Sequence, residues 1–119
     1  MKIQWLDGPE TQDYPAAFSY LNLLFPDKAA QQFVKSLKTA KTRQFKAKDI
    51  FRASGLSLLG TSNSHVKKNQ AKIRAGQKLS PVLLVRDRDR GKVIIADGYH
   101  RVCAVYTFDE DAFVPCRIV

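Results

Sequence analysis

The sequence has no apolar run long enough to cross a bilayer. Such a run needs about 20 consecutive apolar residues, and polar residues interrupt every apolar stretch of this chain before that length. The first residues, from Met1 to Asp7, also lack the apolar core of a secretory signal. No internal repeat and no low-complexity segment is present. We therefore expect a cytoplasmic protein with no membrane partner.

Cysteine is scarce, with only Cys103 and Cys116. Neither belongs to a CxxC motif, and no group of cysteine and histidine has the spacing of a metal site. Both lie among apolar residues, where a free cysteine packs as a small hydrophobic side chain. We expect two buried, reduced thiols and no metal site, with a disulfide between them as the alternative.

The chain is short and basic. With 119 residues, of which 45% are hydrophobic, it suits a single domain with one core. Its net charge of +9 is concentrated, because residues 28–78 hold thirteen basic side chains against one acidic side chain, Asp49. Such a band attracts anionic partners, namely nucleotides, nucleic acid or an acidic protein, or it is simply a solvated surface.

Helical patterns fill the N-terminal third. Asp13-Tyr14-Pro15 is typical of a helix start, with Asp13 as the N-cap and proline in the first turn. Pro26 ends the apolar stretch that follows, and Asp27 is the expected cap of a second helix with apolar residues at helical spacing. The two helices predict a helical hairpin in an N-terminal extension, residues 1–42, that lies over a core formed by residues 43–119.

Strand patterns prevail after residue 43. A short strand at 44–47 and a helical turn at 48–53, ending near Gly55, precede a surface helix at 65–75 that Ser64 caps and Gly76 stops. Residues 81–96 predict a β-hairpin whose strands do not alternate, which indicates burial on both faces. A helix at 99–106 and a strand at 113–119 complete an α+β prediction.

The segment that joins the hairpin to the helix at 99–106 reads Asp97-Gly98-Tyr99-His100-Arg101. The first N–H groups of a helix lack intrahelical partners and attract anions. Gly98 permits a sharp turn, His100 can donate to a phosphate, and Arg101 can hold two phosphate oxygens at once. Asp97 can cap the helix, bind a metal or accept a proton. The alternative is a plain turn, capped by Asp97, with Arg101 paired to the acidic loop at 109–111.

Residues 61–119 resemble the ParB/sulfiredoxin-like superfamily. The similarity lies in the strand at 79–85 (LSPVLLV), the strand and helix at 93–106 (VIIADGYHRVCAVY) and the strand at 114–119 (VPCRIV). The D-G-Y-H-R form of the motif is similar to that of an uncharacterised bacterial group. Residues 1–42 have no counterpart in the superfamily.

The resemblance implies a small mixed sheet with flanking helices and a nucleotide phosphate bound at the turn of residues 98–101. Sulfiredoxins carry their cysteine where this chain has Tyr99, and Cys103 lies a full turn further along the helix, so sulfiredoxin activity is not expected. The chain also has no room for the separate DNA-reading domain of ParB proteins. Similar D-G-H-H-R motifs occur in small-molecule kinases of the superfamily that use ATP or ADP.

The superfamily also places groups from the helix after the loop at 60–64 near the phosphates. By that resemblance, the expected phosphate-binding residues are Gly98, Tyr99, His100, Arg101, Ser64, His65 and Lys68. Asn63 and Lys67 are further candidates, and Lys48 and Arg52 are candidates for the same pocket. For each lysine, the alternative is a solvated helix face.

Three classes of function are compatible with these patterns. The first is a nucleotide- or phosphate-binding protein, as an ATPase or phosphotransferase that uses ATP or another nucleotide with magnesium. Its expected catalytic residues are Asp97, as base or magnesium ligand, and His100, which stabilises charge. The second is a nucleic-acid-binding protein or nuclease that uses residues 28–78, with aromatic rings to stack on bases: Trp5, Phe45 and Phe51. The third is a non-catalytic regulatory protein that binds a partner through the helices at 13–40.

Overall fold

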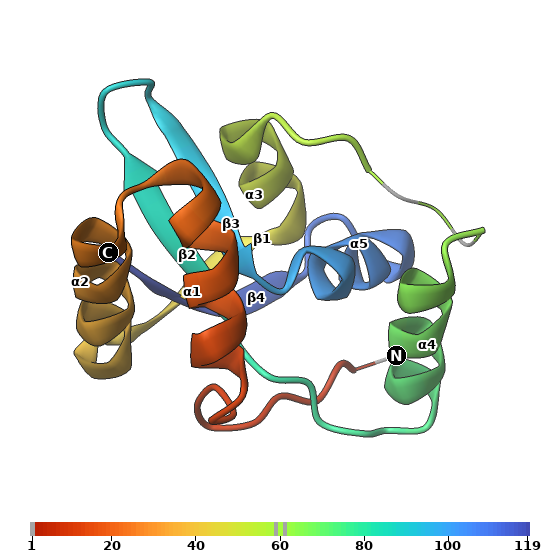
Figure 1. Cartoon of the computed structure of the whole chain (residues 1–119). Coiled ribbons are helices and arrows are strands. Elements are labelled where there is room, and N and C mark those ends of the chain that lie inside the picture. Colours follow the sequence, from red (N-terminus) through yellow and green to blue (C-terminus); the bar gives the residue numbers. More distant parts are fainter. Residues whose placement is uncertain (1, 59, 61) are drawn as a thin grey trace.

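Figure 1 shows the computed structural model of the chain, which describes residues 2–58, 60 and 62–119. Within these residues the chain is α+β, with five helices and a four-stranded mixed sheet. The helices are α1 (Asp13–Leu24), α2 (Asp27–Thr39), α3 (Ala47–Ser54), α4 (Ser64–Arg74) and α5 (Tyr99–Phe108). The strands are β1 (Thr42–Lys46), β2 (Val82–Asp87), β3 (Lys92–Asp97) and β4 (Phe113–Ile118).

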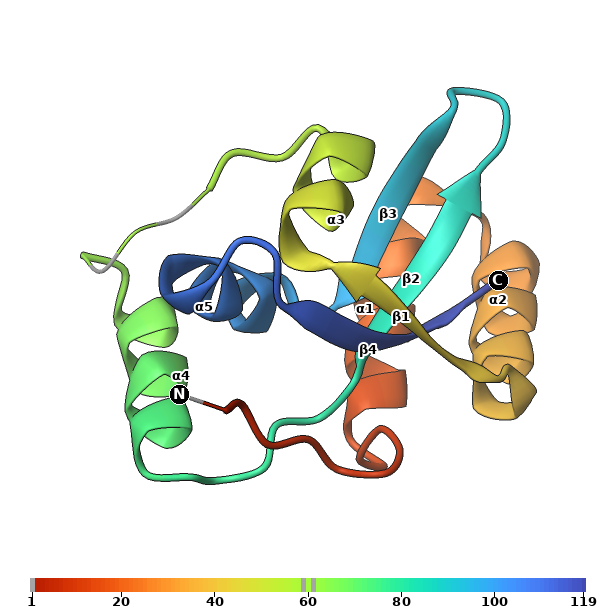
Figure 2. The same cartoon turned by 180° about the vertical axis from the view of Figure 1, so that it is seen from behind.

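The sheet has the strand order β1-β4-β2-β3. β2 and β3 form the antiparallel hairpin expected from the sequence. β4 lies inside the sheet, antiparallel to β1 and parallel to β2. β1 and β3 are therefore the two edges of the sheet, as Figures 1 and 2 show from opposite sides.

Helices cover both faces of the sheet. On one face, Val82 and Leu84 of β2 pack in a buried cluster with side chains of α3, α4 and α5. On the other face, Leu83 and Val85 pack in a second cluster with side chains of α1 and α2. Consecutive residues of β2 thus point into different cores, which explains why the strand is apolar throughout. The expectation that the hairpin is buried on both faces is confirmed for β2, whereas Val93 and Ile94 of β3 are only half-buried.

The predicted helix stops agree with the structure better than the predicted caps do. Gly55 and Gly76 follow α3 and α4 with φ angles of 68° and 72°, in the left-handed conformation that glycine favours. Asp13 and Asp27 are the first residues of α1 and α2 rather than their caps, and neither helix has a capping side chain within the part of the chain that the structure describes. The capping roles predicted for these two residues are therefore wrong.

The N-terminal segment packs against the segment that leads into β2. The backbone N–H of Leu6 donates to the carbonyl of Leu79 over 2.8 Å, and the N–H of Leu79 donates to the carbonyl of Gln4 over 2.9 Å. This pairing carries the chain to the start of α1 beside Ser80. Among the described residues, none of the helices has the length and apolar character of a membrane span.

Candidate functional site

The turn between β3 and α5 depends on a β-bulge and on Gly98. Leu84 pairs with Ile95 and Leu83 pairs with Asp97, so the register shifts by one residue at Ala96. Gly98 then adopts a φ of 109°. A Cβ atom at Gly98 would lie 2.9 Å from both Val82 Cγ2 and Arg101 Nη2, so only glycine fits there. The bulge and the glycine together turn the end of β3 towards α1 and start α5.

Arg101 is engaged inside the protein. Its Nη2 donates to Asp97 Oδ2 over 2.9 Å and to the carbonyl of Pro81 over 3.3 Å. The two charged side chains are each only 17% exposed. Arg101 Nε is buried without a hydrogen-bond partner. The expected grip on two phosphate oxygens therefore has to be revised, because Nη2 is already used and Nε is enclosed by protein.

The acidic loop at 109–111 does not pair with Arg101, as the plain-turn alternative proposed. Asp111 instead forms an ion pair with Lys48, with 2.6 Å between Oδ1 and Nζ. The Nζ atom of Lys46 lies 3.8 Å from the same oxygen. These contacts lower the pKa of Asp111 and raise the pKa of Lys48. Arg52 pairs with Asp49 on its own helix. Neither Lys48 nor Arg52 lines the cavity beside Asp97, although both were candidates for it.

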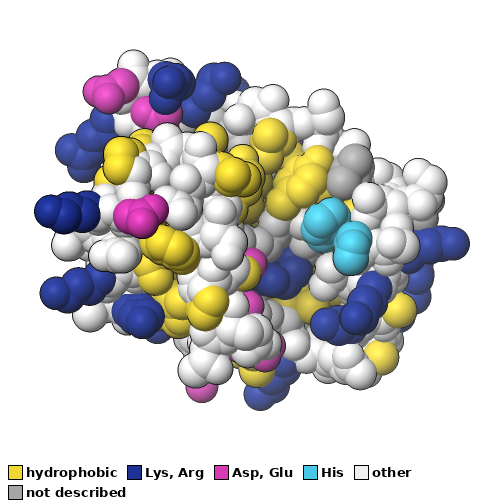
Figure 3. All heavy atoms as spheres, in the orientation of Figure 1, with side chains coloured by type: hydrophobic (Ala, Val, Ile, Leu, Met, Phe, Trp, Pro, Cys, Tyr) yellow, Lys and Arg dark blue, Asp and Glu magenta, His cyan; other side chains and the backbone are white. Residues whose placement is uncertain are grey.

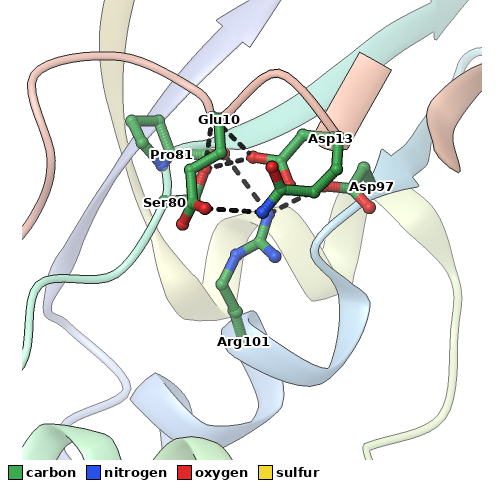
Figure 4. A network of polar contacts seen from close by, with 7 residues as sticks. Glu10, Asp13, Ser80, Pro81, Asp97 and Arg101 are labelled. Atoms are coloured by element: carbon green, nitrogen blue, oxygen red, sulfur yellow. Dashed lines mark hydrogen bonds and ion pairs between the residues drawn. The ribbon is translucent and has the colours of Figure 1, made fainter. Parts of the chain in front are cut away.

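Asp97 lies in a buried polar network that also includes α1. Figure 4 shows Arg101 extending from α5 towards Asp97, with Asp13 and Ser80 nearby. Asp13 is buried, and its Oδ2 accepts from the Ser80 hydroxyl and from the backbone N–H of Glu10 over 2.9 Å. Burial raises the pKa of Asp97, Arg101 opposes that rise, and the nearby Asp13 adds to it. Asp97 therefore holds a proton more readily than an ordinary carboxyl group.

Asp13 and Ser80 could not be recognised from the sequence as members of this network, because both belong to segments far from Asp97 in the chain. The expected capping role of Asp97 is also wrong. Gly98 is the N-cap of α5, and among the described residues no side chain caps that helix. The first-turn amides of α5 are thus not capped by a side chain.

His100 and His65 lie side by side although they come from different helices. Their ring centroids are 4.8 Å apart, and the two rings are neighbours on the surface in Figure 3. Burial lowers the pKa of His100, and the neighbouring His65 lowers it further. A neutral imidazole with one N–H donor is therefore favoured at His100 near neutral pH.

Tyr99 also lies beside His100. The two ring centroids are 5.3 Å apart, and the Tyr99 hydroxyl donates to the carbonyl of Ser57. Burial, followed by Cys103, raises the pKa of Tyr99. Cys103 and Cys116 are both buried, as expected, and no disulfide joins them. Burial raises the pKa of Cys116 to about 12, so this thiol stays protonated.

The start of α4 differs from the prediction. Asn63, not Ser64, is the N-cap, and its side-chain oxygen accepts from the N–H groups of His65 and Val66 over 3.0 and 3.2 Å. Two of the amides expected to meet an anion are therefore already occupied. Ser64, His65 and Lys68 are exposed on α4. Among them, only His65 contacts a residue of the 98–101 turn in the described structure.

A cavity of about 400 Å³ adjoins the 98–101 turn. Its wall is formed by four consecutive residues of the motif, Asp97 to His100, by Ile95 and Ala96 of β3, and by Tyr20 and Leu56. Asp97 is the one carboxylate among these lining residues. No group of three or more potential metal ligands occurs in the part of the chain that the structure describes.

The basic residues do not form a single surface on the face shown in Figure 3. Lysine and arginine side chains lie there at separated positions over different elements. Two of the aromatic residues proposed for base stacking are engaged in packing. Phe51 is buried against Tyr106 and Tyr99, so its stacking role is wrong. Phe45 packs against the core and Arg43 lies over its ring, whereas Trp5 borders a separate cavity.

Comparison with known proteins adds no relative. No protein-family model, no curated protein and no solved structure matches this chain. The function is therefore inferred from the turn, the buried network and the cavity themselves.

Proposed function

We propose that the chain binds a small phosphorylated ligand, with a nucleotide as the first choice, at the opening of α5 in a core of the ParB/sulfiredoxin-like type. One observation carries the proposal. The motif residues Asp97 to His100 form the wall of a cavity of about 400 Å³, at a helix start that no side chain caps. Such a helix start offers N–H donors and a partial positive charge to an anion.

The two histidines extend this anion site. His100 lines the cavity, and His65 of α4 brings a second imidazole within ring contact. A phosphate beside both rings favours their protonated forms, so binding takes up protons and tightens as the pH falls. Gly98 allows the ligand to approach the backbone closely. These groups replace the arginine grip that the motif led us to expect.

Arg101 acts on the site through Asp97. The ion pair ties the first turn of α5 to the end of β3, and the bond to the carbonyl of Pro81 ties both to the start of β2. Arg101 is therefore a positioning residue for the turn. Its charge is largely balanced by Asp97, which leaves the amides and the histidines as the groups that recognise phosphate.

ATP hydrolysis or phosphoryl transfer is the catalytic form of this proposal, with Asp97 as the proton acceptor. In that case the attacking hydroxyl donates to Asp97 Oδ1, because Oδ2 accepts from the guanidinium. Magnesium, expected together with the nucleotide, meets a single carboxylate in the cavity wall, and that carboxylate is engaged by Arg101. The residues fit the phosphate but not a metal held by the protein.

Calorimetry with ATP, ADP, CTP, GTP and inorganic phosphate tests the proposal. We expect binding of at least one nucleotide at millimolar concentration, weakened by His100→Gln and by His65→Gln. Lys35→Gln on α2 is the control, because it removes a positive charge from a surface helix outside the cavity wall. Failure of all five ligands to bind, or equal losses in the three variants, would contradict a phosphate site at α5.

A further inference from the structure

β3 is an open edge of the sheet with an apolar sequence. Among the described residues, no backbone hydrogen bond joins residues 92–97 to any segment other than β2. The other edge, β1, carries exposed Arg43 and the cation of Lys46, a pattern that discourages strand addition. β3 instead contains Val93, Ile94 and Ile95. Unpaired backbone groups beside apolar side chains offer a template for one more strand.

Two adjoining cavities follow this edge. The first has a volume of about 330 Å³ and lies between Tyr20 and Leu24 of α1, Leu56 after α3, and Val93 of β3. The second is the cavity beside Asp97, and it shares Tyr20, Leu56 and Ile95 with the first. We call the two together the β3 groove. α1 and α3 both pack against β3, so the edge lies recessed between two helices.

Large apolar side chains gather around the β3 groove. Tyr20, Leu24 and Leu56 line it and are each 41% exposed or more. Figure 3 shows hydrophobic side chains grouped over the part of the surface where α1 and α3 lie. Exposed apolar clusters of this kind mark surfaces that bind other proteins.

The charges at the hairpin end of the β3 groove favour an acidic occupant. Asp87 and Arg90 line this end and neutralise each other in an ion pair at 3.0 Å. Lys92 also lines it, and within the described residues it has no ion pair. The net charge of the whole chain, +9, adds to the preference for an acidic partner.

We propose that the β3 groove binds an extended segment of a partner protein as a fifth strand of the sheet. The segment alternates apolar side chains, which enter the groove, with acidic side chains, one of which pairs with Lys92. A strand opposite the six residues of β3 spans about 20 Å. A second copy of this chain is disfavoured as the occupant. Its β3 would be equally recessed, and the two copies would repel each other because each has a net charge of +9. A strand along all of β3 also reaches the cavity beside Asp97, where phosphate is proposed to bind, whereas Leu24 and Lys92 line only the hairpin half of the groove.

Nuclear magnetic resonance on the full, isotope-labelled chain tests strand addition. The probe is a capped eight-residue peptide that alternates valine and glutamate. We expect it to shift the amide resonances of residues 92–97 and to slow their hydrogen exchange at least about tenfold, with β1 unaffected. A version N-methylated at alternate amides should not bind, and a version with lysine in place of glutamate should bind roughly two- to fivefold more weakly. Binding of the N-methylated peptide, or no response of β3, would overturn the proposal.

Neighbouring leucines on α1 supply a matched pair of variants. Leu24 lines the β3 groove and is 51% exposed, whereas Leu23 is 82% exposed and is not part of the groove wall. Leu24→Asp should weaken the peptide about tenfold, whereas Leu23→Asp should change affinity less than about twofold. Equal losses would contradict the groove as the binding surface.

Sedimentation equilibrium tests whether a second copy of the chain occupies the groove instead. A dimer that Leu24→Asp abolishes would show that it does. Leu24 does not line the cavity beside Asp97, so Leu24→Asp should leave nucleotide binding, measured by calorimetry, unchanged. The two proposals can therefore fail separately.

Discussion

Arg101 and Asp97 are joined by an ion pair at 2.9 Å that closes the turn between β3 and α5. The pair is mostly buried, so removal of one partner leaves the other charge in a poorly solvated place. The same pair determines what the turn can do, because it holds the one arginine of the motif away from a ligand. Its contribution to folding and to binding can be separated by substitution.

Arg101→Ala should destabilise the fold. The loss of the guanidinium leaves the Asp97 carboxylate buried beside Asp13, and we expect the free energy of unfolding to fall by about 2–4 kcal/mol. The double variant Asp97→Asn with Arg101→Ala should recover part of that loss, because no charge is left unpaired. Urea denaturation measures both. A change below about 0.5 kcal/mol for Arg101→Ala would place the pair among weak surface contacts.

The pH dependence of stability should reveal the environment of Asp97. Its pKa is raised above 3.8, so the folded chain binds this proton more tightly than the unfolded chain does. The stability due to this group is present below pH 3.8 and is lost as the pH rises through the folded pKa. The stability of the wild-type chain relative to Asp97→Asn should therefore decline over that range.

Asp111 provides the opposite case in the same experiment. Lys48 lowers its pKa, so its contribution is present above pH 3.8 and is lost as the pH falls through the folded pKa. The stability of the wild-type chain relative to Asp111→Asn should rise with pH. Slopes of the same sign for the two variants would refute the environments described for these carboxyl groups.

The His65–His100 contact should be visible in proton titrations. Burial and His65 hold the pKa of His100 below 6.5, and any stability due to this group is present above pH 6.5 and lost as the pH falls through the folded pKa. His65→Gln should move the His100 pKa upward, towards 6.5, because it removes a neighbouring cation. The pH dependence of the ring-proton resonances measures the pKa of His100 in the wild-type chain and in His65→Gln. An unchanged His100 pKa in His65→Gln would mean that burial alone sets it.

Asn63 and Ser64 form a pair of neighbours with different expected effects. Asn63→Ala removes the cap from two amides of α4 and should lower the free energy of unfolding by about 1 kcal/mol. Ser64→Ala should change it by less than about 0.5 kcal/mol, because Ser64 is exposed on the first turn of the helix. Thermal unfolding of the two variants, side by side, decides which residue is the cap.

Local features of the fold were predictable from the sequence, and long-range pairings were not. Gly55, Gly76 and the hairpin of residues 81–96 carry their signals in a few adjacent residues, and the structure agrees with each. The unbroken apolar sequence of β2 is likewise a local signal, and it indicated that helices cover both faces of the sheet. The position of β4 between β1 and β2 depends on contacts between distant segments, for which the sequence has no local signal.

The candidate site shows the same division. Gly98 and the start of α5 were predicted from residue types, whereas the partner of Arg101 was not, because the acidic loop at 109–111 was the only partner considered. Arg101 pairs instead with Asp97, which lies four residues before it and is brought close by the bulge at Ala96. Asp13 and Ser80 entered the network only through the packing of α1 on the sheet.

The place of β4 in the sheet has a consequence for how the chain acquires its structure. β1 and the β2–β3 hairpin have no direct contact as neighbouring strands, and β4, the last strand in the sequence, joins them on either side. During synthesis, β1 and the β2–β3 hairpin cannot join into one sheet until residues 113–118 leave the ribosome. Pairings such as Thr42 with Arg117 span most of the chain, and contacts of that separation slow folding. The unfinished sheet is then the stage at which the nascent chain most needs protection from aggregation.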